Sequence, residues 1–165
     1  MDENQFWNIL EESKRGKNVS QDAQMTNLRA LLDRLDLDEI VAFDRIFDEM
    51  RAKSYTHDLW GAAYLINGGC SDDGFEYFRR ALIAEGRQKF EAAMRDPETL
   101  AEWVEEETEF EEIYHVAREA YRAKAGTEDF PEHDLRFPRA PSGGSWDDGE
   151  LEARFPLIAE KFGYS

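Results

Sequence analysis

The chain has 165 residues and a formal net charge of -17 at pH 7, with 41% hydrophobic and 35% charged residues. This size and apolar content predict one folded domain, whereas the acidic surplus excludes nucleic acid and anionic membranes as partners of the bulk surface. Because the chain has a single cysteine, it can form neither an internal disulfide nor a multi-cysteine zinc site. It has no run of roughly 20 apolar residues and no signal-like start, so we expect a cytoplasmic protein.

Three helices are expected first, each after a residue whose side chain can accept a hydrogen bond from the first turn. Asp2, Ser20 and Asp36 are these caps, and Gly16 ends the first helix. Apolar residues recur at spacings of three and four, which is typical of helices and excludes strands. The three stripes are Phe6, Ile9 and Leu10; Met25, Leu28, Leu31, Leu32 and Leu35; and Ile40, Phe43, Phe47 and Met50.

The next helix, residues 59–67, is expected to be the buried centre of the fold. It begins LWGAAYLI, which is apolar all the way round, as a surface helix cannot be. Trp60 and Tyr64 lie one turn apart and would anchor it. The glycine pair after Asn67 can adopt left-handed dihedrals, which favours a sharp turn of the chain there.

A fifth helix is expected from Asp72 to about Gly86, packing its phenylalanines inward. Residues 88–94 either continue this helix or follow a break at Gly86-Arg87, and both interpretations stay open.

Further helices are expected up to Gly126. Pro97 suits a first helical position, so the sequence predicts a short helix over residues 97–103. A longer one follows, with a stripe of Phe110, Ile113, Tyr114, Ala117 and Tyr121.

Residues 127–146 are rich in proline and glycine and predict an irregular arm that lies on the helical body, anchored by Phe130 and Phe137. Residues 147–165, with Pro156 starting a last helix, return the chain to the core. The expected fold is an all-α single domain, a bundle of about seven to eight helices in which residues 1–126 form the body.

The stretch NGGCSDDGF, residues 67–75, is explained first as a turn between two helices. Ser71 would cap the second helix, and Asp72 and Asp73 would favour its dipole. Cys70 and Phe75 stand in the positions of a hydrophobic staple. A phosphate loop is excluded, because GxxxxGK[ST] is absent and two aspartates would repel the anion.

Two kinds of chemistry remain as alternatives at this turn. Cys70 could be a nucleophile, although no sequence signature ties any histidine to it. Asp72 and Asp73 are weak metal candidates, but Asp72, Glu76 and Arg79 share one edge of the helix, which favours an ion pair over a cation site. We therefore predict no cofactor and assign no catalytic residue.

The turn and its flanking helices could also form a pocket for a small molecule. An acid or base would come from Asp72 or Glu76, and the arginines would hold an anionic group. The candidate lining residues are Trp60, Tyr64, Asn67, Cys70, Ser71, Asp72, Asp73, Glu76, Arg79 and Arg87.

Residues 102–112, EWVEEETEFEE, concentrate glutamates without a basic residue. Such a run is usually a solvated helix face, and the functional alternative is a docking surface for a basic partner. Its candidate residues are Glu105, Glu106, Glu107, Glu109, Glu111 and Glu112.

The block WGAAYLINGGCSDDGFEYFRRALIAEGRQKFEAAMRDPETLA, the N-terminal FW, a glutamate-rich helix ending in a tyrosine and the C-terminal FPLIAEKFG resemble the bacterial family known as domain of unknown function 4240. Ala81 departs from the family's usual FRxWL. The resemblance implies no activity. Members of the family occur alone, in actinomycetes for example, or beside a WGR module associated with nucleic-acid processing and regulation, and these 165 residues contain no such module.

Our leading hypothesis is a protein-binding or regulatory module with an acidic surface and no catalysis of its own, whose partner is a protein, basic in character. One rival is an enzyme or small-ligand binder with the pocket described above. Another is an acidic immunity or antitoxin-like protein. The sequence makes no prediction of the oligomeric state.

Overall fold

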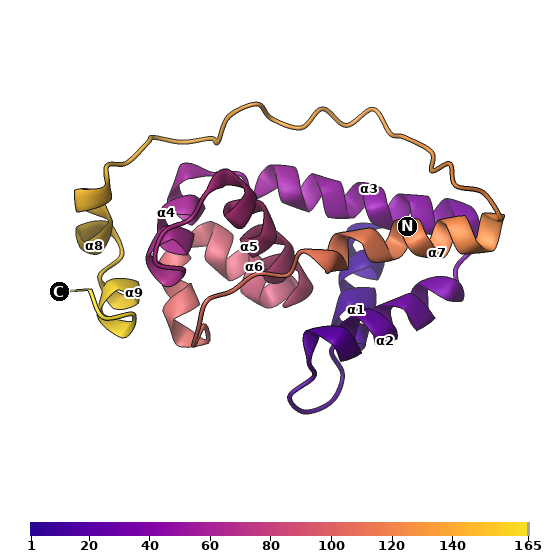
Figure 1. Cartoon of the computed structure of the whole chain (residues 1–165), viewed down its shortest axis with the longest axis horizontal. Coiled ribbons are helices and arrows are strands. Elements are labelled where there is room, and N and C mark those ends of the chain that lie inside the picture. Colours follow the sequence, from indigo (N-terminus) through magenta and orange to yellow (C-terminus); the bar gives the residue numbers. More distant parts are fainter. Residues whose placement is uncertain (165) are drawn as a thin grey trace.

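The computed structural model describes residues 1–164, and the chain within them is built from helices without strands (Figure 1). This confirms the all-α prediction. Ser165, the end of the expected C-terminal segment, lies outside the described residues. The α-helices are α1 (Glu3–Ser13), α2 (Gln21–Asp33), α3 (Leu37–Lys53), α4 (His57–Ile66), α5 (Asp72–Ala84), α6 (Arg87–Arg95), α7 (Val116–Ala125), α8 (Leu151–Arg154) and α9 (Pro156–Lys161), and short 3-10 turns form at Pro97–Glu102, Glu112–His115 and Asp148–Glu150.

The predicted helix starts are confirmed because the cap side chains make the expected bonds. Asp2 and Asp36 each accept from the backbone three residues on, and a glutamine or glutamate there reaches back to the cap, completing capping boxes. Ser20 accepts from Ala23 in the same way. Each cap stabilises its helix by about 1 kcal/mol.

Helix α4 is largely buried, as its composition predicts. Leu59, Ala62 and Ala63 are fully or almost fully buried, and the helix is in contact with α5, α8 and α9. Trp60 is half-buried, so its indole lies at the edge of the core. None of the helices described is both long and apolar enough to cross a bilayer.

Two glycine turns fix the path of the chain around α5. Gly68 and Gly69 both have positive φ, 65° and 112°, and reverse the chain after α4. Gly86 has φ 105°, which ends α5 and starts α6 as a separate helix. The open alternative at residues 86–87 is therefore decided in favour of a break.

The glutamate-rich segment is a loop, so the predicted helix over it is wrong. Residues 103–111 have no helical structure, and a 3-10 turn leads into α7 only from Glu112. Phe110, expected on a helical stripe, is buried from the loop and its N–H donates to the Tyr77 carbonyl at 3.0 Å. Neighbouring glutamates without basic partners repel each other on a helix, and these tertiary bonds favour the extended path.

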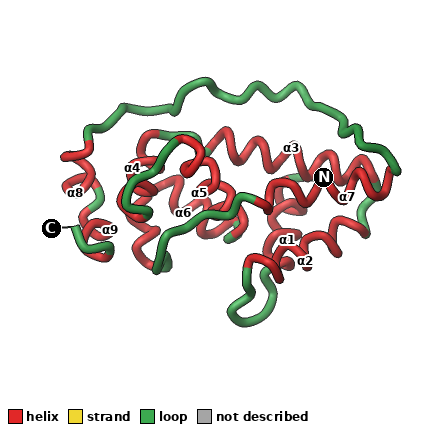
Figure 2. The backbone as a smooth tube through the Cα atoms, in the orientation of Figure 1, coloured by secondary structure: helices red, strands yellow, loops and turns green. Residues whose placement is uncertain are grey.

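The C-terminal arm, residues 127–146, forms no helix. Gly126 ends α7 with a left-handed φ of 68°. From there the chain runs past the outer side of α3 to α8, as the long upper loop in Figure 1 and Figure 2 shows. Leu151, Phe155 and Ile158 then bring the chain back into the core.

Candidate functional site

The turn at residues 70–73 is held by its own side chains. The Ser71 hydroxyl accepts from the Gly74 N–H at 3.1 Å, which confirms it as the cap of α5. The Trp60 indole donates to the Cys70 carbonyl at 2.9 Å. Asp72 accepts from the Tyr55 hydroxyl at 2.9 Å, and Asp73 is exposed in the first turn. The Ser71 and Asp72 side chains and the Cys70 carbonyl therefore already have partners within the protein.

The ten candidate pocket residues do not all come together. Tyr64 lies toward the C-terminal segment, where its ring is 5.5 Å from that of Trp146. Arg87 donates to Asn4 at 2.6 Å and to Glu91 at 2.9 Å, next to α1.

Glu76 is the centre of an arginine cluster between α3 and α5. Arg51 donates to the two carboxylate oxygens of Glu76 at 2.8 and 2.6 Å. Arg80 donates to the same carboxylate at 2.7 Å, and Arg79 at 3.1 Å. Burial opposes ionisation of Glu76, but the bonds and charge of Arg51 outweigh it and lower the pKa to about 2. The sequence predicts the pair with Arg79; it gives no sign of Arg51, which comes from α3.

Arg79 is the least satisfied member of this cluster. Its side chain lies over the rings of Phe75 and Tyr55, with Cζ 4.5 and 4.7 Å from their centroids. The residue is 1% exposed, and Nε and Nη1 have no acceptor among the described residues. Burial lowers its pKa to about 10, although Glu76 opposes the shift.

Cys70 is unsuited to nucleophilic attack at neutral pH. Burial raises the pKa of its thiol to about 12, and the negative charge of Glu109 adds to this more than Arg79 offsets. An activated cysteine needs the opposite shift.

Sequence analysis misses a second charged cluster, on α3, α7 and the arm. Atoms of Asp44, Asp48 and His133 that could act as metal ligands lie within 4.8 Å of one another. Arg118 donates to Asp44 at 3.4 Å, and Arg51 to Asp48 at 2.5 Å. Burial raises the pKa of Asp44 and Arg118 opposes this. Because the guanidinium groups of Arg118 and Arg51 already offset the carboxylates of Asp44 and Asp48, the arrangement is an ion-pair network. The only sequence signal for it is that residues 44, 48 and 51 share one helical face.

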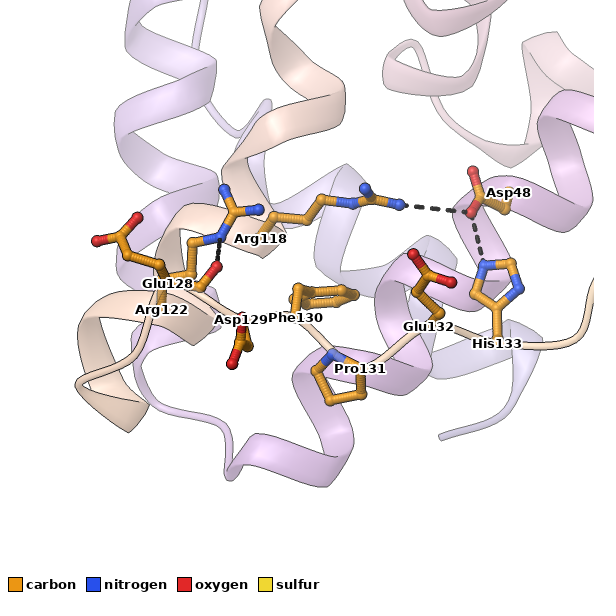
Figure 3. Close-up of a pocket in the computed structure, with 9 residues that line it drawn as sticks. All are labelled: Asp48, Arg118, Arg122, Glu128, Asp129, Phe130, Pro131, Glu132 and His133. Atoms are coloured by element: carbon orange, nitrogen blue, oxygen red, sulfur yellow. Dashed lines mark hydrogen bonds and ion pairs between the residues drawn. The ribbon is translucent and has the colours of Figure 1, made fainter.

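A cavity of about 580 Å³ lies beside this network, between α7 and the arm. Figure 3 shows the ring of Phe130 beside Arg118, with Asp48 joined by dashed lines to both Arg118 and His133. The lining residues are Asp48, Arg118, Arg122, Glu128, Asp129, Phe130, Pro131, Glu132 and His133.

The glutamate loop, residues 103–111, forms one wall of a second cavity of about 510 Å³, which we call the acidic groove. All six glutamates singled out from the sequence are exposed. Burial and repulsion from Glu107 and Glu111 raise the pKa of Glu109. The groove is lined by Lys14, Gly16, Asn18, Val19, Gln21, Glu85, Lys89, Trp103, Val104, Glu105, Glu106, Glu107, Thr108 and Glu109.

Backbone contacts hold this loop in place. The Thr108 carbonyl accepts from the side-chain NH₂ of Asn67 at 3.3 Å, and the Thr108 N–H donates to the side-chain oxygen of Asn67 at 2.9 Å. Gln21 donates to the Glu109 carbonyl at 2.7 Å. The glycine turn thus supports the loop through Asn67, a role that the sequence does not indicate.

A model of the family described as protein of unknown function (DUF4240) matches residues 1–123. This confirms the resemblance seen in the sequence motifs. The match takes in the arginine cluster and the glutamate loop and ends before the arm, so FPLIAEKFG lies outside it. No curated protein and no solved structure matches the chain.

Proposed function

The chain belongs to the DUF4240 family, whose description names no activity, and we propose that it is a protein-binding module that captures a basic segment of a partner protein in the acidic groove. One observation carries this proposal. Glu106, Glu107 and Glu109 line the groove and are exposed, and no basic group among residues 1–164 pairs with them.

Electrostatics favour a cationic occupant. Carboxylates that raise one another's pKa gain from a nearby positive charge, because it reduces their repulsion. Burial is the largest cause of the raised pKa of Glu109, and the negative charges of Glu107 and Glu111 add to it. An exposed ion pair contributes only about 0.2–1 kcal/mol, so we expect several contacts, an affinity that falls with salt and fast association.

The two lysines that line the groove are already engaged within the protein. The Nζ of Lys89 lies 4.3 Å from the centroid of the Trp103 ring, so this indole already accepts a cation on its face. Glu85 holds Lys14 and Lys89 at 2.5 and 3.0 Å, and Lys161 pairs with Glu105, which leaves Glu106, Glu107 and Glu109 for the partner.

The rival pocket at residues 67–79 has less support, because Trp60, Asn67 and Asp72 are engaged by internal hydrogen bonds. An immunity or antitoxin-like role would be a special case of the proposed function, with a basic toxin as the partner.

The test is calorimetric titration with an arginine-rich peptide. E106Q/E107Q/E109Q should weaken binding by about tenfold or more. The matched control is E119Q/E150Q/E160Q, which removes the same charge from exposed residues outside the groove and should leave the affinity within about twofold. Equal losses in the two variants would show that net charge alone attracts the peptide, and the groove would not be the binding site.

A further inference from the structure

The arm, residues 127–146, lies on the body as a docked extended chain. It crosses from α7 past α3 to α8 without forming a helix (Figure 1). Near its end it pairs with the chain between α3 and α4. The Ser142 N–H donates to the Tyr55 carbonyl at 3.0 Å, and the Ser142 carbonyl accepts from His57 at 2.9 Å.

The first half of the arm is fixed by an aromatic and an ionisable side chain. The ring of Phe130 lies 5.1 Å from the ring of Tyr121 and 5.1 Å from Cζ of Arg118. His133 Nε2 lies 2.6 Å from a carboxylate oxygen of Asp48. Figure 3 shows both side chains pointing from the arm toward the helices.

A second aromatic anchor follows seven residues after the first. The ring of Phe137 lies 5.7 Å from that of Tyr55 and 4.9 Å from Cζ of Arg51. Arg79 lies 5.9 Å below the same ring, with its Nε and Nη1 free of acceptors among the described residues. This surface thus offers aromatic faces together with guanidinium donors that the arm leaves unused.

The arm and the surface beneath it have complementary charge. Asp134 pairs with Arg45 at 3.0 Å, and the Glu128 carbonyl accepts from Arg122 at 2.9 Å. The first eight residues of the arm contain four acidic ones, Glu128, Asp129, Glu132 and Asp134. Residues 128–142 also contain Arg136 and Arg139, so the acidic half of the arm is its first half, and this half contacts the arginines of α3 and α7 through one ion pair and one hydrogen bond.

The docking is local and loose. Phe137 is 37% exposed, and most arm residues are exposed. The cavity of about 580 Å³ remains between the arm and the body. A chain held at a few points and open to solvent between them is the kind of segment that opens at low free-energy cost.

The residues of the surface and the residues of the arm that covers it come from different parts of the sequence. Arg45, Asp48, Arg51, Tyr55, Arg79, Arg118 and Tyr121 all lie within residues 1–123, which the family model matches. The arm begins after them. The surface therefore lies within the matched residues, and the segment that covers it lies after them.

We propose that this face of α3, α5 and α7 is a docking surface for an extended acidic segment of a partner protein that carries two aromatic anchors, and that residues 128–142 occupy it as an intramolecular stand-in. Aromatic pockets that hold an extended proline-containing chain are a recurring mode of peptide recognition. Because the arm is tethered at both ends, its high local concentration makes the partner displace it rather than find the face open. This surface is separate from the acidic groove, and neither proposal depends on the other.

The test uses the full chain and a fluorescein-labelled peptide of residues 127–143 as the probe. In F130A/F137A the arm loses its two anchors, so the peptide should bind by fluorescence anisotropy about tenfold or more tighter than it binds the unaltered chain. A peptide carrying the same two alanines is the matched control and should bind neither protein. Circular dichroism checks that the variant keeps its helices, which we expect because both phenylalanines lie in the arm.

Two further measurements complete the test. Trypsin should cleave after Arg136 and Arg139 faster in F130A/F137A than in the unaltered chain, since the arm is released. The proposal is wrong if the peptide binds the variant no better than the unaltered chain, if the control peptide binds equally well, or if trypsin cleaves both proteins at the same rate. A dimer with exchanged arms in light scattering would also overturn it, because the occupant would then be a second copy.

Discussion

The side-chain amide of Asn67 and the backbone of Thr108 form two hydrogen bonds, at 2.9 and 3.3 Å, that join the turn after α4 to the glutamate loop. N67A removes both bonds, so the loop should loosen and the arginine-rich peptide should bind roughly threefold to tenfold more weakly, as expected for a loss of about 1 kcal/mol. Hydrogen exchange at the Thr108 amide should accelerate in parallel. T108A keeps both backbone bonds and is the control; equal behaviour of the two variants would mean that Asn67 does not position the loop.

Glu76 should contribute strongly to stability. Because Glu76 accepts hydrogen bonds from three partly or fully buried arginines, E76Q removes the carboxylate charge that faces them and should cost roughly 3 kcal/mol in urea unfolding. E49Q, which breaks the exposed pair with Arg45 at 3.3 Å, should cost less than about 1 kcal/mol. Similar costs for the two variants would show that the arginine cluster is not a stabilising unit.

The same residue predicts a pH dependence. Burial opposes ionisation, but Arg51 lowers the folded-state pKa of Glu76 from 4.5 to about 2. The folded protein therefore binds the proton more weakly than the unfolded chain does, so this stabilisation is complete above pH 4.5 and is lost as the pH falls toward 2. Urea unfolding of the unaltered chain and of E76Q as a function of pH should show their difference shrinking over this window; a constant difference would contradict the assignment.

Cys70 should react slowly with iodoacetamide. With its pKa raised to about 12 by burial and by Glu109, the thiolate fraction at neutral pH is very small, and alkylation should be about a hundredfold or more slower than in the unfolded chain. Mass spectrometry with and without urea measures both rates. Alkylation of the folded protein at the unfolded rate would revive the nucleophile hypothesis.

Gly61 should not tolerate a side chain. A Cβ there would lie 2.7 Å from Leu151 Cδ2 and 3.2 Å from a ring carbon of Phe155. Alanine in the middle of α4 would gain about 1 kcal/mol in helix propensity, but the overpacking costs about 1–3 kcal/mol. We expect G61A to lower the melting temperature by a few degrees, whereas at the open position of Gly149 the same change should have little effect. A G61A protein as stable as the unaltered chain would mean that α8 packs less closely than described.

Local signals account for the parts of the fold that the sequence predicts. The caps at Asp2, Ser20 and Asp36, and the turn at residues 67–71, depend on residues within one helical turn of each other. Such contacts are readable from spacing alone. The burial of α4 is likewise predicted from its own residues, because they are apolar on every side of the helix.

The missed features depend on contacts between distant segments. Arg51 reaches Glu76 across 25 positions, and Arg118 reaches Asp44 across 74, so no local pattern indicates either pair. The helix expected to carry Phe110 does not form over residues 103–111, because Asn67 and Tyr77, far away in the sequence, bond the backbone there. Tertiary contacts override a local helical pattern in this way when the intrinsic preference is weak.

The most direct test of the proposed function is the pKa of Glu109, measured by NMR titration of its carboxyl carbon without and with the arginine-rich peptide. In the free protein, burial and repulsion from Glu107 and Glu111 should hold this pKa above its ordinary value. Binding in the acidic groove should bring cationic groups to the glutamates and lower it, while Glu119 outside the groove should be unaffected. A bound peptide that leaves the Glu109 pKa unchanged would contradict the proposal.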